Sequence, residues 1–516
     1  MRKITTIFLL LLIIVLPLSA FDGFSDIFGF DEELESSTTT SFTQESKGID
    51  LSGTVSFFIE GNKLGTDFQT AVQGGLTLDL AWRGSIVDAK ASLELLPTID
   101  NEMEWIDIFT QLSILTYFEG GRIEAGLLKK EWGSGDGVHV VDVLNAPDYR
   151  KGIVDDPLEM KISEPMIMST ATFKDTTLDV VYKPMLIPMV AAEKPEDYWA
   201  MPQPNPLGSF GSESLGSILP PEALPFIDNI IAIFNPESLH VKMDTPSNEE
   251  LATISNSQFG ARIKTIAGPA DVGFIYWNGF YNTPSFAFSL NLEGEEKQAS
   301  FPIKDASKMT SLFPGMKGFA DEITDPDEAI SEFITKIKFT RAQLFGAEAT
   351  VISGPFTLML EGGFWLSEDF KGEDPTLYNN KFVYLAGLGL MIPKTSAYLN
   401  VTYHGQYILN FDKDNIFDSD TLQASISSNG KPYMNTLVAA LELPLAKEKV
   451  NVRLAGTYQF ETKGYAVLPS VTWNVNDDLR VKLSGRMYGA LKDSSPSLFK
   501  EWKDKDTFSI GISYLF

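Results

Sequence analysis

The sequence has no cysteine, only three histidines, and 41 basic residues against 69 acidic ones. Without cysteine the chain can form no disulfide and carry no lipid-modified N-terminal cysteine, which fits an exported protein that needs no oxidative cross-link. The net charge of −28 leaves no basic patch to meet phosphates, which argues against nucleic acid as a partner. Beyond the first twenty residues, no apolar run is long enough to cross a bilayer as a helix.

The N-terminus has the pattern of a secretory signal peptide. Arg2 and Lys3 precede a continuous apolar run over residues 7–16, and Leu18-Ser19-Ala20 offers a cleavage site. A transmembrane anchor is the alternative, but the run is shorter than the roughly 20 residues that a spanning helix needs. We therefore expect residues 1–20 to be removed on export and the acidic, Ser/Thr-rich residues 21–47 to form a disordered periplasmic lead-in.

The distribution of apolar residues separates two classes of protein. A chain of 516 residues that is 44% apolar could form two or three soluble domains. Here, however, the apolar residues recur at every second position in segments of about ten residues, which is typical of transmembrane β-strands. The high content of glycine, phenylalanine and tyrosine, with 40, 36 and 16 residues, is consistent with that class. The sequence therefore predicts an all-β membrane barrel.

The last ten residues form the clearest of these segments. Phe508, Ile510, Ile512, Tyr514 and Phe516 lie on one face, small and polar residues lie on the other, and Leu515 is the exception. In water this would be an exposed apolar edge strand that promotes aggregation. We expect it instead to be the closing strand of a barrel, with its apolar face toward outer-membrane lipid, and to be recognised by the barrel-assembly machinery.

The alternation predicts eighteen strands in an antiparallel up-and-down barrel, an even number as bacterial single-chain barrels require. The predicted strands are 49–60, 69–82, 86–96, 103–118, 121–131, 164–174, 176–184, 255–267, 271–281, 337–353, 356–367, 380–392, 395–411, 434–445, 448–461, 465–475, 479–490 and 507–516. Alternate connections are very short and rich in turn residues, and the others are mostly long. This phase places both termini on the short-turn, periplasmic side. Sixteen strands is the alternative count.

Three connections in the barrel region 48–516 are long, at residues 131–164, 185–254 and 282–336. We expect short helices at 221–234, where apolar residues have helical spacing, and at 326–335, where Asp325 can cap the N-terminus. Loops of this length are usually functional. They could fold into the lumen as constrictions or cap the outer mouth.

One stretch resembles a known family. The strand over residues 122–130 leads into Trp132-Gly133-Ser134-Gly135-Asp136-Gly137 and then into residues 142–149, Asp-Val-Leu-Asn-Ala-Pro-Asp-Tyr. This order resembles the eighteen-stranded, substrate-specific outer-membrane porins that include the alginate-export porins, whose "G-R-Q-x-x-x-W-G" strand leads into an "x-D-x-x-N-P-x-D" loop. Here Gly-Leu-Leu-Lys-Lys replaces the Gly-Arg-Gln core and Ala146 separates asparagine from proline. The resemblance implies the barrel and no particular solute.

The same stretch can be interpreted from its chemistry alone. We expect Trp132 at the membrane interface, where an amphipathic ring is favoured, and expect Gly133 and its neighbouring glycines to let the chain turn inward. Asp136, Asp142 and Asp148, with Asn145 between them, could bind a cation such as Ca²⁺. Their spacing is not that of an EF-hand, so a structural loop held by Asx turns is favoured and no metal site is predicted.

The residues opposite the apolar faces are predicted to point into the lumen, because a charge facing lipid would cost roughly 2–4 kcal/mol. The inward basic residues are Arg453, Arg480, Lys482, Arg486, Arg262 and Lys264, and the inward polar and acidic residues are Glu94, Glu348, Glu361, Glu442 and His404. These charges could neutralise each other in a mesh that fixes the barrel shape. Alternatively, the cations could form a basic track that guides anions. The acidic connection 185–254 would instead concentrate cations, unless it is only a solvated surface.

The expected function is that of a passive, selective diffusion channel for small polar or charged solutes in the outer membrane of a diderm bacterium. No enzyme is predicted, since His139, His240 and His404 are accompanied by no Gly-x-Ser-x-Gly motif, and no cofactor is implied. A hydrophobe uptake barrel of the long-chain fatty acid type is one alternative. A non-conducting surface adhesin or structural barrel is another. The solute and the oligomeric state are not predicted.

Overall fold

The computed structural model describes residues 49–64, 67–84, 86–95, 108–154, 156–192, 198–200, 241–292, 330–413, 418–491 and 497–516. The predicted signal peptide, the lead-in at 21–47 and the expected helix at 221–234 lie outside these residues. No helix in the described part of the chain is long and apolar enough to cross a bilayer.

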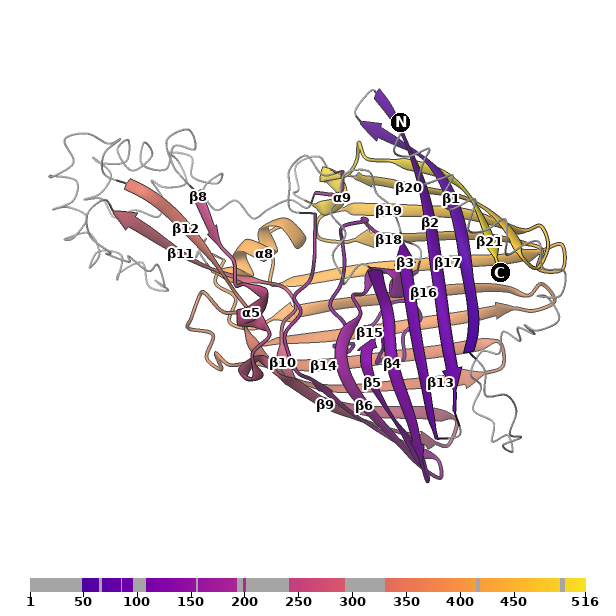
Figure 1. The fold of residues 1–516 in the computed structure, drawn as a ribbon. Helices are drawn as coiled ribbons and strands as arrows, with labels where there is room; N and C mark the ends of the chain where they lie inside the picture. Colours follow the sequence, from indigo (N-terminus) through magenta and orange to yellow (C-terminus); the bar gives the residue numbers. More distant parts are fainter. Residues whose placement is uncertain are drawn as a thin grey trace.

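Eighteen strands form one closed antiparallel barrel (Figure 1). They are β1 (Ile49–Leu64), β2 (Asp67–Arg83), β3 (Val87–Leu95), β4 (Phe109–Phe118), β5 (Gly121–Leu128), β6 (Glu164–Phe173), β7 (Thr176–Lys183), β9 (Gln258–Ala267), β10 (Ala270–Phe280), β13 (Arg341–Ser353), β14 (Phe356–Ser367), β15 (Lys381–Ile392), β16 (Ala397–Ile408), β17 (Tyr433–Leu445), β18 (Val450–Gln459), β19 (Gly464–Asn474), β20 (Leu479–Ala490) and β21 (Thr507–Leu515). Each strand pairs with its neighbours in chain order, and β21 closes the barrel by pairing with β1 over Asn62↔Thr507 to Thr54↔Leu515.

Every strand predicted from the alternation corresponds to one barrel strand, so eighteen is confirmed and sixteen is excluded. The connection between β4 and β5 spans residues 119–120 and that between β6 and β7 spans 174–175, whereas β5 and β6 are separated by residues 129–163. Short and long connections therefore mostly alternate between the two barrel ends; the exceptions are the connections 65–66 and 460–463, which are short although they lie at the end with the long connections. β1 begins and β21 ends at the end with the short turns, because Ile49 pairs with Trp82.

The outer face of the barrel is apolar because alternate residues of each strand point outward. Phe508, Ile510, Ile512 and Tyr514 of the closing strand are all exposed there, at 41–52%. On β20, Leu483 is 50% exposed and lies between Lys482 and Ser484, which point to the other face. An apolar surface of this extent is stable only in a bilayer, so the prediction of a membrane barrel is confirmed.

The wall of the barrel is uneven in height. β1 and β2 have 16 and 17 residues, whereas β5 and β7 have eight each. A groove of about 870 Å³ runs over the outer face of β2 to β7, where the small side chains of Ala89, Ala91 and Ala125 leave a depression between Trp82 and Tyr182. Gly126 lies in the same region with φ +144°, and a Cβ there would be 1.9 Å from the carbonyl oxygen of Leu112. Glycine is therefore required where β4 and β5 approach.

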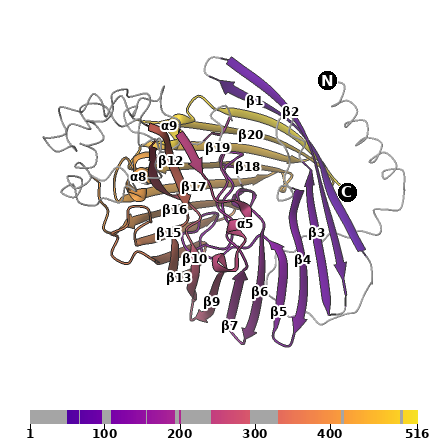
Figure 2. The same cartoon turned by 60° about the vertical axis from the view of Figure 1, so that its left-hand side comes forward.

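The long connections carry the remaining elements. β11 (Ser285–Leu292) and β12 (Ile330–Lys338) pair antiparallel, and β8 (Val241–Asp244) adds to β12 in parallel. This three-stranded sheet projects from the barrel end with the long connections, at the left of Figure 1 and beside α8 in Figure 2. The helices are η1 (Pro157–Met160), α5 (Asn248–Leu251), η3 (Ile254–Asn256), α8 (Ser419–Ser427) and α9 (Leu498–Glu501).

The helix predicted at 326–335 is wrong for the part that the structure describes. Residues from Ile330 onward form β12, which has two strand partners. The segment is rich in β-branched residues, which favour an extended chain. The possible N-cap at Asp325 was a weaker signal than this composition.

Candidate functional site

The main core of this protein lies inside the barrel, where residues 129–163 fold into the lumen. Trp132, Val141 and Leu144 of this loop are completely buried, against side chains of β5, β6, β7, β10, β13, β14 and β15. Glycines on the inner wall make room for the loop. A Cβ at Gly363 would be 3.5 Å from Val141, and one at Gly260 would be 3.2 Å from Trp132. The loop therefore packs directly on the barrel wall.

Trp132 is buried in the lumen and does not lie at the membrane interface, so that prediction is wrong. Its ring meets Trp277 of β10 edge to face, with 6.4 Å between centroids, and Arg262 lies 5.8 Å from its centroid. Gly133, with φ +126°, turns the chain inward directly after the tryptophan. A tryptophan beside a strand end is compatible with either side of the wall, and the inward turn decides the side.

Glu361 on β14 binds this loop to the barrel wall through hydrogen bonds. Its Oε1 accepts hydrogen bonds from the backbone nitrogens of Ser134 and Gly135, both at 2.7 Å, and contacts Nδ1 of His139 at 3.0 Å. Its Oε2 accepts from the backbone nitrogens of Val140 and Val141, at 2.7 and 3.3 Å. Hydrogen bonds to the charged form are what make a buried carboxylate tolerable. The inward position of Glu361 was predicted from alternation, but its five partners were not.

The loop also reaches a second part of the wall. Arg486 of β20 donates from Nη1 to the carbonyl oxygen of Lys151 at 2.7 Å. Five strands, β15 to β19, separate β14 from β20 in the sheet. Because the loop starts at β5 and contacts both β14 and β20, it forms a polar cross-piece through the lumen. This loop, residues 129–163, is the candidate functional site and is called the lumen loop below.

The pKa of His139 makes the attachment of the lumen loop dependent on pH. Burial lowers this pKa, while the hydrogen bond and charge of Glu361, with smaller effects of Asp142 and Glu131, raise it to a net value above the ordinary 6.5. Protonation therefore stabilises the attached loop fully below about pH 6.5, and this stabilisation is lost as the pH rises through the raised pKa.

We expect single-channel conductance to be lower near pH 5.5 than near pH 8.5, because the attachment is tighter when His139 is charged. The variant His139→Gln keeps a hydrogen-bond donor but cannot titrate, and it should lose most of this difference. Conductance is measured in planar bilayers at both pH values. Equal pH dependence in the wild-type protein and the variant would contradict the role given to His139.

The acidic residues of the loop act separately and structurally. Asp142 accepts from the backbone nitrogens of Trp132 and Leu144, at 3.1 and 3.2 Å, and forms an ion pair with Lys161. Asp136 accepts from Nδ2 of Asn400 at 2.6 Å. Among the described residues there is no group of three or more side chains that could hold a metal ion. This arrangement supports the structural interpretation of the motif over the cation site.

Asn145 holds the two ends of the loop together, and Asp148 makes a local contact within it. Asn145 accepts from the backbone nitrogen of Lys130 and donates from Nδ2 to the carbonyl oxygens of Leu128 and Ile162, all at 2.8 Å. Asp148 accepts from the backbone and side chain of Arg150. Burial raises the pKa of Asp148. The hydrogen bonds and the charge of Arg150 lower it by more, so the net pKa lies below its ordinary value.

The basic residues predicted for the lumen lie on the inner face, and several of them have acidic partners. Arg453 contacts Glu442 at 3.1 Å. Arg486 contacts Glu60 at 2.8 Å and lies over the ring of Trp199.

Arg262 pairs with Asp179 at 2.7 Å and lies 3.7 Å from the buried Glu348. Arg480 donates to the side chain of Asn474 at 3.1 Å, and Lys482 is exposed on the same strand. Lys264 and Glu94 are both partly exposed, on β9 and β3. The structure thus brings Arg262, Glu348 and Glu361 together near the lumen loop, and it leaves Arg453 in a separate pair on β17 and β18.

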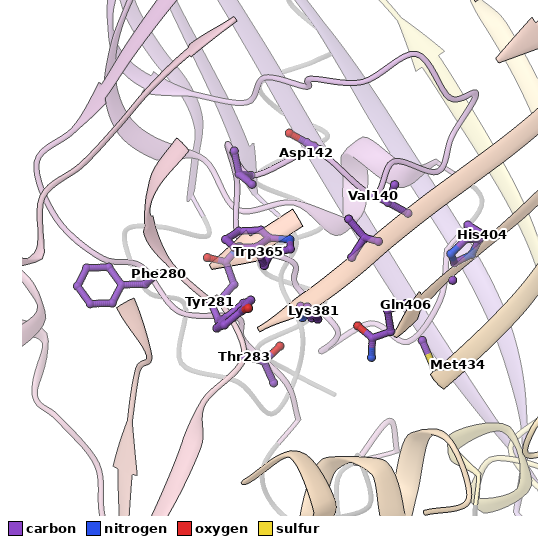
Figure 3. A pocket seen from close by; sticks show the side chains of 14 residues that line it. Val140, Asp142, Phe280, Tyr281, Thr283, Trp365, Lys381, His404, Gln406 and Met434 are labelled. Carbon is purple, nitrogen blue, oxygen red and sulfur yellow. The ribbon is translucent and has the colours of Figure 1, made fainter. Parts of the chain in front are cut away.

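A cavity beside the lumen loop was not predicted from the sequence. It has a volume of about 250 Å³ and is lined by Val140, Asp142, Val143, Phe280, Tyr281, Asn282, Thr283, Trp365, Lys381, Val383, His404, Gly405, Gln406 and Met434 (Figure 3). Only His404 among them was selected as a lumen residue. The same alternation also places Lys381 inward, because its neighbour Phe382 is exposed to lipid. The convergence of these residues depends on the strand order and could not be read from one strand.

The described residues assemble no activated nucleophile around His139. Glu361 orients the imidazole as an acid would in a hydrolase, but the nearby Ser134 donates its hydroxyl to the carbonyl oxygen of Leu360 at 2.9 Å. His404 lines the cavity, and His240 lies outside the described residues. The arrangement supports attachment of a loop, and no nucleophile is paired with His139 among the described residues.

Comparison with known proteins gives structural likeness only. No family model matches the chain, and no curated protein matches it. Among solved structures the chain is similar to OccAB3 of Acinetobacter baumannii, with 8% identity and a TM-score of 0.44 over 91% of this chain and 99% of that one. It is also similar to OccK8 (OprE) of Pseudomonas aeruginosa, with 9% identity and a TM-score of 0.44 over 91% and 98% of the two chains.

A third similar structure is Wzi of Escherichia coli, an outer-membrane protein involved in group 1 capsule assembly and described as a carbohydrate-binding β-barrel. It has 10% identity and a TM-score of 0.43 over 90% of this chain and 84% of that one. Likeness of this extent assigns no solute and no site residue to the present chain. The resemblance of residues 122–149 to the alginate-export porins therefore stays a prediction.

Proposed function

We propose that this protein is a porin-like outer-membrane channel for passive, selective diffusion of small polar or charged solutes. One observation supports this above the others. The lumen is crossed by a loop that the buried carboxylate of Glu361 binds to the wall, with four backbone N–H groups and His139 as donors. A cross-piece held by specific hydrogen bonds narrows a pore to a defined shape, which is how channels select among solutes.

The charges of the lumen favour a network of neutralised ion pairs over a continuous track of unpaired basic residues. Arg453, Arg486 and Arg262 each have a carboxylate within 3.1 Å. A paired cation presents less field to a passing anion than an unpaired one, so selectivity should depend on the places where charge is not balanced. The start of β1 and the end of β21 lie at the rim of the barrel that carries the short turns. We infer that this rim faces the periplasm.

The test is conductance and reversal potential of the purified protein in a planar bilayer under a salt gradient. Discrete conductance steps support the channel, and the sign of the reversal potential shows whether cations or anions pass preferentially. Complete absence of conductance at several voltages and pH values would count against it. The protein would then be a hydrophobe uptake barrel or a non-conducting surface barrel.

A further inference from the structure

The cavity beside the lumen loop contains a cation with an unusual environment. The side-chain ammonium of Lys381, the first residue of β15, forms no hydrogen bond or ion pair with any residue that the structure describes. Its ammonium group lies 4.4 Å from the ring centroid of Tyr281. In contrast, Arg453, Arg486 and Arg262 have close carboxylate partners. Lys381 therefore contributes a positive charge that its surroundings do not cancel by contact.

The acidic groups near the cavity are committed elsewhere. Asp142 lines the cavity but accepts from two backbone nitrogens and pairs with Lys161. Asp420, the carboxylate that acts on Lys381 electrostatically, accepts from the backbone nitrogen of Asn379 at 2.7 Å. The hydroxyl of Tyr281 donates to the carbonyl oxygen of Asn379. None of these groups contacts the ammonium of Lys381, so this ammonium is left available to an anion bound in the cavity.

The rest of the lining combines apolar surface with a few polar groups. Val140 and Val143 come from the lumen loop and Val383 and Met434 from the wall, while His404 and Gln406 add polar groups on β16 (Figure 3). Mostly apolar walls with a few convergent polar groups are typical of ligand sites. A volume of about 250 Å³ corresponds to roughly eight water molecules at about 30 Å³ each, which suits a small organic molecule.

The cavity lies on the long-connection side of the lumen loop. Lys381 begins β15 there, and Trp365 lies two residues before the end of β14. Val140 and Val143 belong to the loop itself, so a molecule in the cavity would contact the cross-piece before passing it. A solute bound here would be held immediately outside the constriction.

We propose that this cavity is a docking site for a small organic monoanion with an apolar body, whose anionic group binds Lys381 and whose body contacts the valines and Met434. The proposal rests on the proposed channel function and deepens it by naming a solute class. Carboxylate and phosphate-like head groups share the required chemistry. The site would let a channel whose chain is acidic overall retain anions at one position in its lumen.

The test uses pentanoate and its neutral counterpart pentanamide, which have similar shape. Binding to the full-length protein in detergent is measured by titration calorimetry. We expect Lys381→Gln to weaken pentanoate binding by about tenfold or more, the loss that removal of one charge-assisted hydrogen bond produces. Pentanamide should bind weakly to both proteins. Comparison of pentanoate with butyl phosphate, which has a similar apolar body, separates a carboxylate site from a phosphate site.

Two matched variants make the result specific. Lys431→Gln removes a lysine that also lies over a tyrosine ring, 5.4 Å from Tyr433, but does not line the cavity, and it should leave binding unchanged. Lys381→Arg keeps the charge and should retain most of the affinity for pentanoate. This variant still tests the role of the charge if Lys381→Gln fails to fold. Equal binding of pentanoate and pentanamide, or loss of pentanoate binding in Lys431→Gln as well, would overturn the proposal.

Calorimetry and conductance also separate this inference from the proposed function. Binding without conductance would leave the anion site intact and reject the channel. Conductance without pentanoate binding would support the channel and reject the anion site.

Discussion

The variant Glu361→Gln is expected to conduct severalfold better than the wild-type protein, because the lumen loop loses its attachment to β14. An amide can accept hydrogen bonds at only one of the two positions that the carboxylate oxygens occupy. Its nitrogen would face either Ser134 and Gly135 or Val140 and Val141, whose N–H groups are donors as well. Two charge-assisted hydrogen bonds contribute about 3 kcal/mol or more, which corresponds to roughly a hundredfold shift toward the detached loop.

Single-channel conductance and limited proteolysis measure this effect together. A detached loop should carry more current and should also be cleaved faster within residues 134–141. The matched control is Glu348→Gln, since Glu348 faces Glu361 directly in the β13–β14 register and is equally buried, yet accepts no hydrogen bond from the described residues of the loop. Unchanged current and cleavage in Glu361→Gln would show that packing of Val141 and Trp132 holds the loop without the carboxylate.

The variant Leu483→Lys is expected to lower the free energy of unfolding by roughly 2–4 kcal/mol, the cost of a lysine on the lipid face near the middle of the bilayer. Leu483 is 50% exposed on the outer face of β20. Its neighbour Ser484 points inward, where its hydroxyl is 2.6 Å from that of Ser509. The variant Ser484→Lys therefore places the same charge in the lumen, and it should cost about 1 kcal/mol, the value of one neutral hydrogen bond.

Equilibrium unfolding of both variants in lipid vesicles gives the comparison. A shift of a single position along the strand changes which environment the lysine meets, lipid or lumen, while the introduced residue stays the same. Similar losses in the two variants would contradict the assignment of the inner and outer faces on β20, and with it the predicted lumen residues Arg480, Lys482 and Arg486.

The barrel could be predicted from the sequence because lipid imposes one local rule on every strand. Outward residues must be apolar, so the two-residue period is visible within each segment without knowledge of its neighbours. The short turns showed which connections lie at the same end of the barrel as the two termini. The inward positions of Glu348, Glu361 and His404 followed from the same rule, and so did the closing role of the last strand.

What lies inside the barrel follows no such rule. Whether Trp132 faced lipid or lumen depended on the turn at Gly133 and on the partners Trp277 and Arg262, which are more than a hundred residues away. The partners of Glu361 lie on a loop that starts at β5, and five strands separate β5 from β14 in the sheet. Lys381 was on a correctly predicted strand, but its importance depends on the lack of a carboxylate contact to its ammonium among the described residues. Such absences are properties of the assembled lumen.

The uneven wall of the barrel imposes a shape on the surrounding membrane. Eight residues in β5 and β7, at about 3.3 Å per residue and a tilt of about 40°, rise only about 20 Å, whereas the hydrocarbon core of a bilayer is about 30 Å thick. Lipid beside these strands must therefore thin, while β1 and β2, with only β3 and β4 between them and β5, have about twice as many residues. The apolar groove extends over the outer face from β2 to β7, across this change in height. Acyl chains are least ordered in such a zone, which makes it the side of the protein where the bilayer is most easily deformed.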